Sequence, residues 1–168
     1  LAGTKEVNDH TDWARKELKE QHYVTEYIVS KLKGLSISKL KISKPSVRFA
    51  GPVKHLQTNI RFNADKTSPQ MIIKTLHPTP ALSGLPQHRA IELIEHYEPH
   101  ERLLYGGIIG LINHSSCSVY VNLRCMQIQL GTANLYVGGG LTAESNALSE
   151  WNETVNKGKT LLNLLQIL

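Results

Sequence analysis

The chain has 168 residues, a length that suits one domain of ordinary size. Apolar residues make up 40% of it, which excludes an intrinsically disordered chain, and 19 Lys and Arg against 14 Asp and Glu give a formal net charge of +5. The apolar runs are far shorter than the roughly 20 residues that span a bilayer, so no membrane partner is expected.

The two cysteines, Cys117 and Cys125, are too few for a disulfide framework or a Cys-only zinc site. They lie in a segment that the pattern predicts as one strand, which would place them about 26 Å apart, too far for a disulfide. We therefore expect reduced thiols and a cytoplasmic protein. The chain begins without Met, and residues 1–4 show neither a helix start nor strand alternation, which suggests a fragment of a longer chain.

The first third predicts a helix over 11–33, with Thr11 as its N-cap and Gly34 after its end. An apolar stripe follows one face of this helix, and Glu20 lies within it, with Glu17 beside it one turn earlier. The stripe consists of Trp13, Val24, Tyr27 and Ile28. Residues 35–62 then predict two or three strands, interrupted by Pro45 and by Gly51-Pro52.

A basic run occupies this strand region, because no acid occurs between Glu26 and Asp65. A nucleic-acid patch is one interpretation, but aromatic residues for base stacking are almost absent. A solvated sheet face with edge lysines is favoured, and no nucleic-acid partner is expected. The run consists of Lys31, Lys33, Lys39, Lys41, Lys44, Arg48, Lys54 and Arg61.

The remainder predicts helices over 68–75 and 86–97, a loop over 77–81, strands over 104–113, 118–130 and 135–137, and a last helix over 145–165. Pro86 is expected at the first helical position, and Ser145 is expected as an N-cap. The fold class that follows is α+β, with antiparallel strands packed by helices.

Two pairs of glutamates are the first candidate functional groups. Glu17 and Glu20, and again Glu150 and Glu153, are spaced i, i+3, so each pair presents two carboxylates on one helix face. Two such helices facing each other would bind a hard divalent cation, above all Mg²⁺. Either pair alone is more often a solvated helix face.

Candidate anion-binding groups follow. Lys157 shares a face with Glu150 and Glu153, either as an exposed ion pair or as a cation for a substrate carboxylate. Arg124 is the only full charge in the alternating part of the strand predicted over 118–130, and its guanidinium can bind a carboxylate through two hydrogen bonds. Residues 138–140, all glycine, either form a tight turn or let backbone N–H groups approach an anion. The histidines lack zinc-ligand spacing.

Taken in order, these segments resemble the chorismate-utilising enzymes, and the order is kept over nearly the whole chain. The motifs that carry the resemblance are Leu1-Ala2-Gly3-Thr4, Lys16-Glu17-x-x-Glu20-Gln21, Val53-Lys54-His55-Leu56, Leu76-His77-Pro78-Thr79-Pro80-Ala81-Leu82, Arg102-x-x-Tyr105-x-Gly107-x-x-Gly110, Leu123-Arg124, Gly138-Gly139-Gly140-Leu141 and Glu150-Trp151-x-Glu153-Thr154-x-x-Lys157. The form with Ala81 resembles isochorismate synthases of both the menaquinone and the siderophore type. Gln21 and Gly139 depart from the usual His and Ala of the family.

The resemblance implies a fragment of the anthranilate synthase-like two-sheet fold, with residues 1–168 as the C-terminal part of the chorismate-binding domain. It implies Mg²⁺-dependent conversion of chorismate to isochorismate. Glu20 and Glu153 would be direct metal ligands, and Glu17 and Glu150 would act mostly through water. Substrate contacts would come from His55, Ala81, Leu82, Tyr105, Leu123, Arg124, Gly138, Gly139 and Lys157.

The same resemblance places the general base and the general acid outside these residues, so none of the site residues named here is catalytic and the chain alone is expected to be inactive. Apolar faces left uncovered in a partial core could join two copies into a dimer. Two rival classes stay open: another chorismate-utilising enzyme (an anthranilate, aminodeoxychorismate or salicylate synthase) and a non-catalytic basic binding domain.

Overall fold

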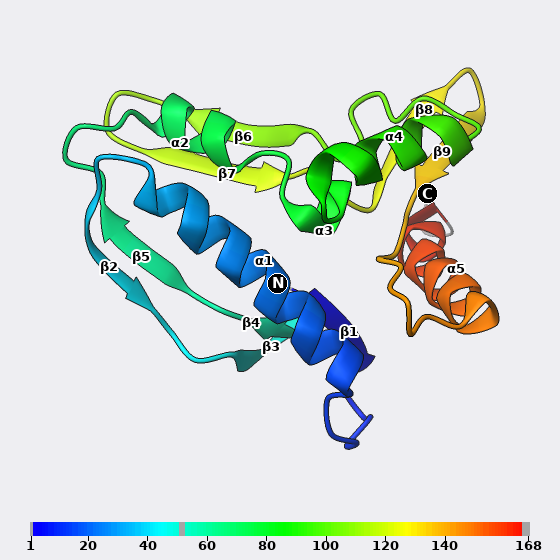
Figure 1. Cartoon of the computed structure of the whole chain (residues 1–168). Coiled ribbons are helices and arrows are strands. Elements are labelled where there is room, and N and C mark those ends of the chain that lie inside the picture. Colours follow the sequence, from blue (N-terminus) through cyan, green and yellow to red (C-terminus); the bar gives the residue numbers. More distant parts are fainter. Residues whose placement is uncertain (1, 51–52, 166–168) are drawn as a thin grey trace. The chain divides into compact units, whose positions relative to one another are not determined.

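A computed structural model describes residues 2–50 and 53–165 (Figure 1). Leu1 and the Gly51-Pro52 step of the strand prediction lie outside these residues. The chain divides into two compact units, Leu1–Ile91 and Glu92–Leu168. All the strand pairings in both units are antiparallel, and helices pack on them, so the predicted α+β class is confirmed.

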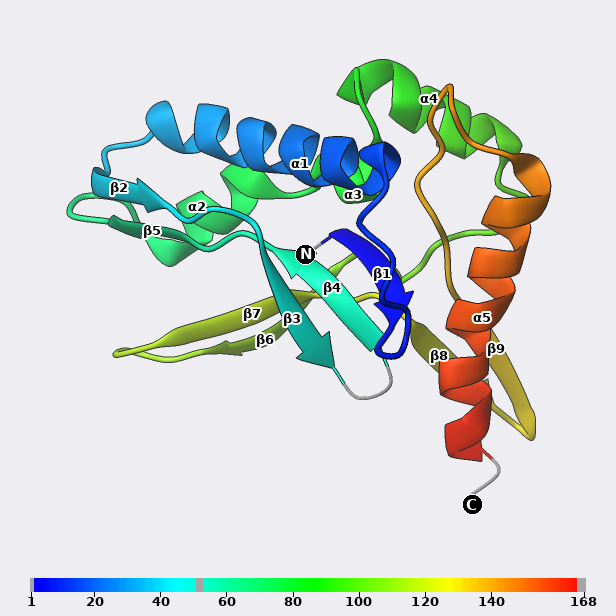
Figure 2. The ribbon, with the colours of Figure 1, turned by 90° about the horizontal axis from the view of Figure 1, so that it is seen from below.

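The first unit is built from one long helix, two short ones and two small sheets. Its elements are β1 (Ala2–Glu6), α1 (Arg15–Lys33), β2 (Ser38–Ile42), β3 (Ser46–Ala50), β4 (Val53–Gln57), β5 (Ile60–Asn63), α2 (Pro69–Leu76) and α3 (Pro80–Ser83). One sheet has the order β1-β4-β3 and the other pairs β2 with β5. Helix α1 packs against β1, α2 and α3 (Figure 2). Leu32 of α1 and Leu56 of β4 are buried, and they mark the centre of this small core.

Strand β1 was not predicted, because its side chains do not alternate. It forms through pairing with β4, where Lys5 lies opposite Lys54. The Lys5 ammonium is then held by the loop that follows, since it donates to the Thr11 hydroxyl at 2.6 Å and to the Asp12 carbonyl at 2.7 Å. A strand that depends on its partner in this way leaves little trace in its own sequence. The number of strands predicted over 35–62, two or three, was too low, because four described strands begin in this stretch, namely β2, β3, β4 and β5.

Two predicted boundaries in this unit were wrong. Helix α1 begins at Arg15, because the Thr11 hydroxyl donates to Asp9 at 2.6 Å instead of capping a helix; its end at Gly34 is confirmed. The predicted loop over 77–81 ends at Thr79, and Pro80 opens α3. Proline is tolerated there because the first N–H of a helix has no intrahelical partner.

The second unit consists of two hairpins and a long C-terminal helix. Helix α4 (Gln87–Tyr97) crosses the boundary between the units, and Pro86 lies directly before it and not at its first position. The other elements are β6 (Ile108–Ile112), β7 (Cys117–Val121), β8 (Cys125–Gln129), β9 (Thr132–Tyr136) and α5 (Ala147–Leu165). Strands β6 and β7 form one hairpin, β8 and β9 form the other, and α5 packs on β9.

The single strand predicted over 118–130 is two strands. The chain breaks at Asn122–Arg124, and Arg124 has a φ of +48°. Next to the break, the Asn122 N–H donates to the Gly107 carbonyl, and the Asn122 carbonyl accepts from the Gly106 N–H, each at 2.8 Å. Cys117 and Cys125 therefore belong to different strands, and both are free thiols.

The start of α5 also differs from the prediction by one residue. Asn146 caps the helix, since its side-chain oxygen accepts from the Ser149 N–H at 3.1 Å. Ser145 instead accepts from the Thr142 N–H at 3.0 Å and closes the turn before the helix. Both residue types are good N-caps, so the sequence alone could not choose between them.

The β6–β7 hairpin exposes apolar side chains on both of its faces. Ile109, Leu111 and Tyr120 are 59, 79 and 68% exposed on one face, and Ile108 and Ile112 are 41 and 49% exposed on the other. The strands approach so closely that a Cβ at Gly110 would lie 2.1 Å from the Ser118 carbonyl oxygen, so position 110 requires glycine. A strand pair that is apolar on both faces is typical of the interior of a larger sheet.

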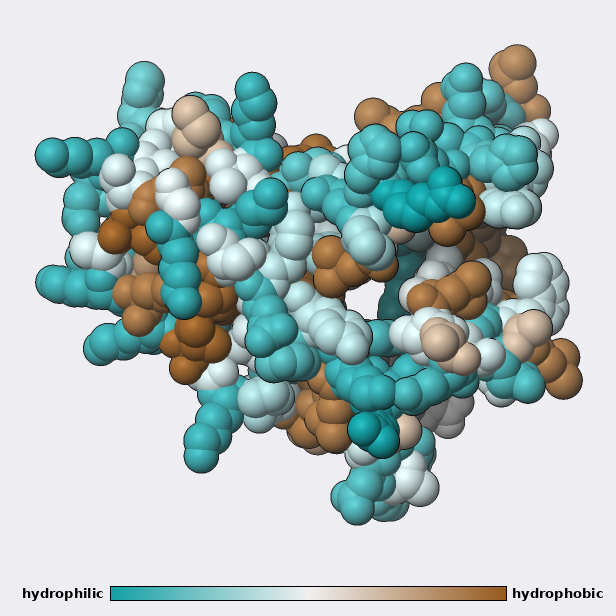
Figure 3. Space-filling view, viewed as in Figure 1, coloured by the Kyte–Doolittle hydropathy of each residue, from teal (hydrophilic) through white to brown (hydrophobic). Residues whose placement is uncertain are grey.

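In the first unit, hydrophobic residues also gather between α1 and the two-stranded β2–β5 sheet on the face seen in Figure 3. Ile42 of β2 is one of the exposed apolar residues of this unit, at 48% exposure. None of the described helices is both long enough and apolar enough to cross a membrane.

Candidate functional site

The loop that precedes β6 places Tyr105 at the centre of the candidate site. The Asn122 side chain donates to the Leu104 carbonyl at 2.9 Å, and the Asn122 backbone pairs with Gly106 and Gly107. These three bonds hold the Tyr105 loop against the chain break at Asn122–Arg124. Asn122 was not predicted as a site residue, because its importance comes only from this pairing.

Two groups hold the Tyr105 ring. The Tyr136 ring stacks against it, with 6.0 Å between centroids and 24° between planes, and the Arg102 guanidinium lies 5.8 Å from its centroid. Burial raises the pKa of the Tyr105 hydroxyl above its ordinary value, although the nearby Arg102 cation opposes this. Tyr105 is therefore a protonated hydrogen-bond donor at neutral pH.

The glycine run after β9 lies against both Tyr105 and α5. A Cβ at Gly138 would lie 2.8 Å from the Tyr105 hydroxyl oxygen. A Cβ at Gly139 would lie 3.7 Å from a Glu150 carboxylate oxygen and 3.9 Å from the Lys157 Nζ, which are ordinary contact distances. The backbone of this turn thus passes directly over the polar face of the helix.

Lys157 joins the glycine run to the second acidic pair. Its side chain is only 16% exposed, and its Nζ lies 2.7 Å from the Glu153 carboxylate and donates to the Gly138 carbonyl at 3.0 Å. Glu150 is buried at 8% exposure, and Thr154 lies between them on the same face, with its hydroxyl bonded to the Glu150 carbonyl. The shared face predicted for Glu150, Glu153 and Lys157 is confirmed, and it is a partly buried face that closes on the glycine run.

Arg124 and Leu123 belong to the chain break and not to the middle of a strand. Arg124 is half-buried, and it directly precedes Cys125, which pairs with Tyr136. Because Tyr136 stacks on Tyr105, the chain break, the Tyr105 loop and the end of β9 belong to one region of the second unit. The interpretation of Arg124 as a charge in an alternating strand was wrong, because it lies between β7 and β8 with a positive φ.

The first acidic pair lies on α1 in the other unit. Glu20 is half-buried and lies 3.9 Å from the Lys16 Nζ, and one carboxylate oxygen of Glu17 is buried with no hydrogen-bond partner among the described residues. A buried carboxylate oxygen without a donor costs free energy unless a cation or a ligand completes it. Glu17 therefore fits a cation-binding role.

The other three predicted substrate residues lie in the first unit. His55 lies in β4, opposite Arg48 of β3, and Ala81 and Leu82 form the middle of α3. Helix α3 packs against α1, the helix that carries the acidic pair. The Tyr27 hydroxyl, 3.4 Å from the Pro78 carbonyl, adds a contact between α1 and the loop before α3.

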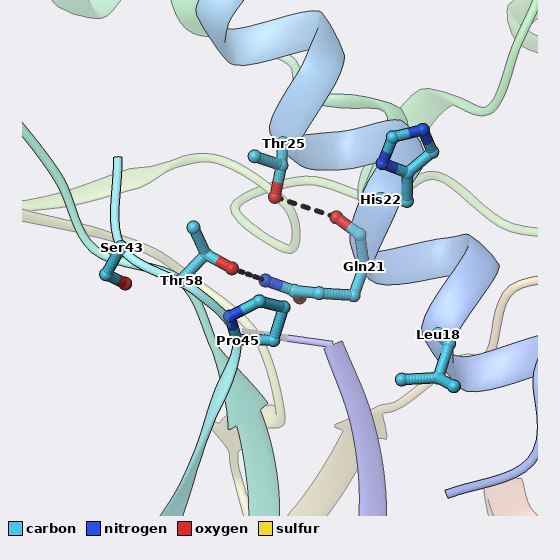
Figure 4. Close-up of a pocket in the computed structure, with 7 residues that line it drawn as sticks. All are labelled: Leu18, Gln21, His22, Thr25, Ser43, Pro45 and Thr58. Carbon is cyan, nitrogen blue, oxygen red and sulfur yellow. Dashed lines mark hydrogen bonds between the residues drawn. The ribbon is translucent and has the colours of Figure 1, made fainter. Parts of the chain in front are cut away.

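Gln21 fixes the position of α1 on the strands. It is 5% exposed, and its side-chain amide donates to the Thr58 hydroxyl at 2.8 Å, between β4 and β5 (Figure 4). Beside this bond lies a pocket of about 140 Å³. Its lining, which includes none of the predicted site residues, is Leu18, Gln21, His22, Thr25, Ser43, Pro45 and Thr58.

Each acidic pair alone supplies two carboxylates. No group of three or more His, Cys, Asp or Glu side chains gathers as a metal site within residues 2–50 and 53–165. Carboxylate oxygens are the hard ligands that Mg²⁺ prefers, so the donor chemistry of each pair suits this cation. In the second unit, a carboxylate and ammonium cluster lies beside a glycine-rich backbone.

Comparison with known proteins names the family. The profile of the chorismate binding enzyme family matches residues 7–166, so the chain belongs to this family. It is 31% identical to the isochorismate synthase EntC of Escherichia coli K12 over 90% of this chain and 39% of that protein. It is also 31% identical to the isochorismate synthase MenF of the same strain, over 99% of this chain and 41% of that protein.

A solved structure agrees. The crystal structure of the 2,3-dihydroxybenzoate-specific isochorismate synthase DhbC from Bacillus anthracis matches with a TM-score of 0.90 and 30% identity, over 99% of this chain and 48% of that chain. A mycobacterial anthranilate synthase component 1 is 39% identical, but over only 52% of this chain and 17% of that protein. The chain spans less than half the length of each of these relatives.

Proposed function

We propose that the chain is part of an isochorismate synthase, which converts chorismate to isochorismate. The observation that carries the proposal is the convergence of Lys157, the Gly138–Gly139 backbone and Tyr105 in one region of the second unit. The substrate is a dianion, and this region offers an ammonium group, backbone N–H groups and a protonated phenol to its carboxylates. Isochorismate synthases are also the relatives that match most of the chain.

The geometry supports a proposed role for each of these groups. Lys157 is held by Glu153 and by the Gly138 carbonyl, so its ammonium is fixed in place before substrate arrives. The Gly138 and Gly139 N–H groups and the Tyr105 hydroxyl would donate to one substrate carboxylate, and Arg124 would form a bidentate pair with it. His55, Ala81, Leu82 and Leu123 would line the ring.

A magnesium ion would be held by Glu20 and Glu153 directly and by Glu17 and Glu150 mostly through water. When bound, it supplies the positive charge that orients a substrate carboxylate. The buried oxygen of Glu17, which has no hydrogen-bond partner among the described residues, supports this assignment, because carboxylates are rarely buried unless they have a partner. The general base and acid are proposed to lie outside residues 1–168.

An anthranilate synthase is the second candidate, favoured by the 39% identity over 52% of the chain. The deciding experiment incubates the full-length protein with chorismate and Mg²⁺, with and without ammonia, and separates the products by chromatography. Isochorismate in both samples supports the proposal, and anthranilate with ammonia or salicylate alone overturns it. The 168-residue chain, tested beside it, is expected to form no product.

Menaquinone and siderophore pathways are equally compatible with the EntC and MenF likeness.

The β6–β7 hairpin is proposed as an interface between two copies of the chain, so the isolated chain should dimerise in solution. Its exposed isoleucine, leucine and tyrosine side chains form the kind of contiguous apolar surface that soluble monomers cover. Sedimentation velocity over a range of concentrations tests this. Leu111→Lys should give a monomer at concentrations where the parent chain is dimeric, and a monomeric parent chain would contradict the proposal.

A further inference from the structure

Glu98 and Arg102 form a two-point ion pair beside the Tyr105 ring, and neither was predicted as a site residue. The Arg102 Nε donates to Glu98 at 2.8 Å and its Nη2 donates to the other carboxylate oxygen at 2.5 Å. Both side chains are more than two-thirds buried, since they are 29 and 31% exposed. A bidentate pair of this kind fixes the plane of the guanidinium, which a single contact would leave free to rotate.

Arg102 contacts Tyr105 in two independent ways. Its carbonyl accepts from the Tyr105 N–H at 2.8 Å, which closes the turn, and its guanidinium lies 5.8 Å from the ring centroid. With Tyr136 stacked on the same ring, the Tyr105 side chain is confined between an aromatic ring and a cation. This confinement directs the Tyr105 hydroxyl at Gly138, where the two lie in close contact.

An ion pair that only stabilised the fold would need no cation near the ring. Glu98 lies one residue after the end of α4, and its N–H still bonds to the Ile94 carbonyl at 2.9 Å. The pair therefore connects the end of α4 to the turn that carries Tyr105. The order of the two charges decides which charge lies over the ring face, because the guanidinium at position 102 is 5.8 Å from the Tyr105 centroid.

We propose that Arg102, fixed by Glu98, is a positioning residue that sets the Tyr105 ring and hydroxyl against Gly138. This role rests on the proposed function, in which Tyr105 and the Gly138 backbone bind a substrate carboxylate. Loss of the cation loosens Tyr105 and weakens substrate binding while the reacting groups stay intact. The effect therefore belongs in KM more than in kcat.

The experiment compares four variants of the full-length protein. Arg102→Gln removes the cation, Arg102→Lys keeps a charge without the fork, and the double variant Glu98→Arg/Arg102→Glu restores an ion pair with the charges exchanged. Glu95→Gln, an exposed carboxylate on the same helix, is the matched control. Each variant is studied by chorismate kinetics, by thermal unfolding and by ¹⁹F NMR of 3-fluorotyrosine placed at position 105.

We expect Arg102→Gln to raise KM about 3- to 30-fold with kcat changed less than about twofold, which corresponds to the loss of one partly buried cation–π contact. The exchanged pair should recover thermal stability but not KM, and its ¹⁹F resonance should differ from the parent. Glu95→Gln should match the parent. If the exchanged pair restores KM, or if Arg102→Gln leaves either KM or the ¹⁹F resonance unchanged, the pair is only structural and the proposal is overturned.

The two proposals fail separately. A parent protein that forms no isochorismate overturns the proposed function, whereas an unchanged ¹⁹F resonance at position 105 overturns the positioning role whatever the activity. If Arg102→Gln does not fold, Arg102→Lys decides in its place, with a smaller rise in KM expected because the cation remains without its fork.

Discussion

The Tyr105 hydroxyl lies so close to the backbone of Gly138 that a methyl group at position 138 would be 2.8 Å from it. The neighbouring glycine is different, because a methyl group at Gly139 would meet Glu150, Thr154 and Lys157 at 3.7–4.0 Å. A side chain at position 138 would therefore collide with Tyr105, whereas position 139 has room for a methyl group.

This difference predicts the order of two alanine variants. Gly138→Ala should displace Tyr105 and lower kcat/KM about tenfold or more, since an overpacked contact costs about 1–3 kcal/mol. Gly139→Ala should lose much less activity, and it should raise the free energy of unfolding by about 0.4–1 kcal/mol through the unfolded chain. Steady-state kinetics and urea unfolding measure both, and equal losses for the two variants would contradict this account of the turn.

Arg124→Lys should keep the positive charge but lose the bidentate fork. We expect kcat/KM to fall roughly tenfold to a hundredfold, which corresponds to the 1.5–3 kcal/mol of a charged hydrogen bond. Circular dichroism checks the fold, and Arg61→Lys on the exposed face of β5 is the matched control. A kcat/KM within twofold of the parent would mean that Arg124 does not hold a substrate carboxylate.

Lys157→Met should weaken chorismate binding without weakening Mg²⁺ binding. The ammonium is bonded to Glu153 and to the Gly138 carbonyl, so its loss removes one substrate partner and leaves the metal carboxylates in place. Lys159→Met, two residues further along α5 and exposed, is the control. Isothermal titration calorimetry with each ligand measures the two affinities, and an equal loss of both would place Lys157 in the metal site.

Substitution of the proposed direct ligands tests the magnesium site. Glu20→Gln and Glu153→Gln should each raise the Mg²⁺ dissociation constant about tenfold or more, because even outer ligands commonly contribute that much. Glu26→Gln, which changes an exposed α1 carboxylate paired with His22 at 3.2 Å, should leave the constant unchanged. If Glu20→Gln behaves like Glu26→Gln, α1 carries no metal ligand.

The Glu98–Arg102 pair predicts a pH dependence of stability. The hydrogen bond from Arg102 lowers the pKa of Glu98 below its ordinary value of 4.5. The unfolded state therefore binds more protons in this range, so the contribution of Glu98 is fully present above about pH 4.5 and is lost as the pH falls through the lower folded-state pKa. The stability difference between the parent and Glu98→Gln should be constant near neutrality and shrink below that pH. A difference that grows on acidification would give the opposite sign.

Helices α1, α2, α4 and α5 were predictable because their signals are local. Apolar periodicity and Gly34 after the end of α1 lie within the segments they define, and the structure places helices there. The shared face of Glu150, Glu153 and Lys157 followed from the same 3.6-residue period. Its burial against the glycine run did not, since that depends on how β9 returns to α5.

The break at Asn122–Arg124 could not be read from the sequence, because the residues on both sides alternate as one strand would. Arginine has no preference for a positive φ, so the residue type at position 124 does not predict the left-handed conformation found there. Next to the break, Asn122 pairs with Gly106 and Gly107, which are distant in sequence, so the local pattern does not show this pairing. Glu98 and Arg102 left a weak signal, an i, i+4 pair of opposite charge, but it falls just outside a helix and was not used.

The two-stranded β2–β5 sheet and the β6–β7 hairpin, which both expose apolar side chains, differ in how they would behave in solution. In the β2–β5 sheet, Lys41 lies directly opposite Arg61, and this repulsive pair discourages another strand from adding to the edge. Between Ile108 and Val121 the β6–β7 hairpin holds no Lys, Arg, Asp or Glu at all. An uncovered hairpin of this composition is a nucleus for aggregation, so the yield of folded chain from a cell should depend on how soon that hairpin is covered during synthesis.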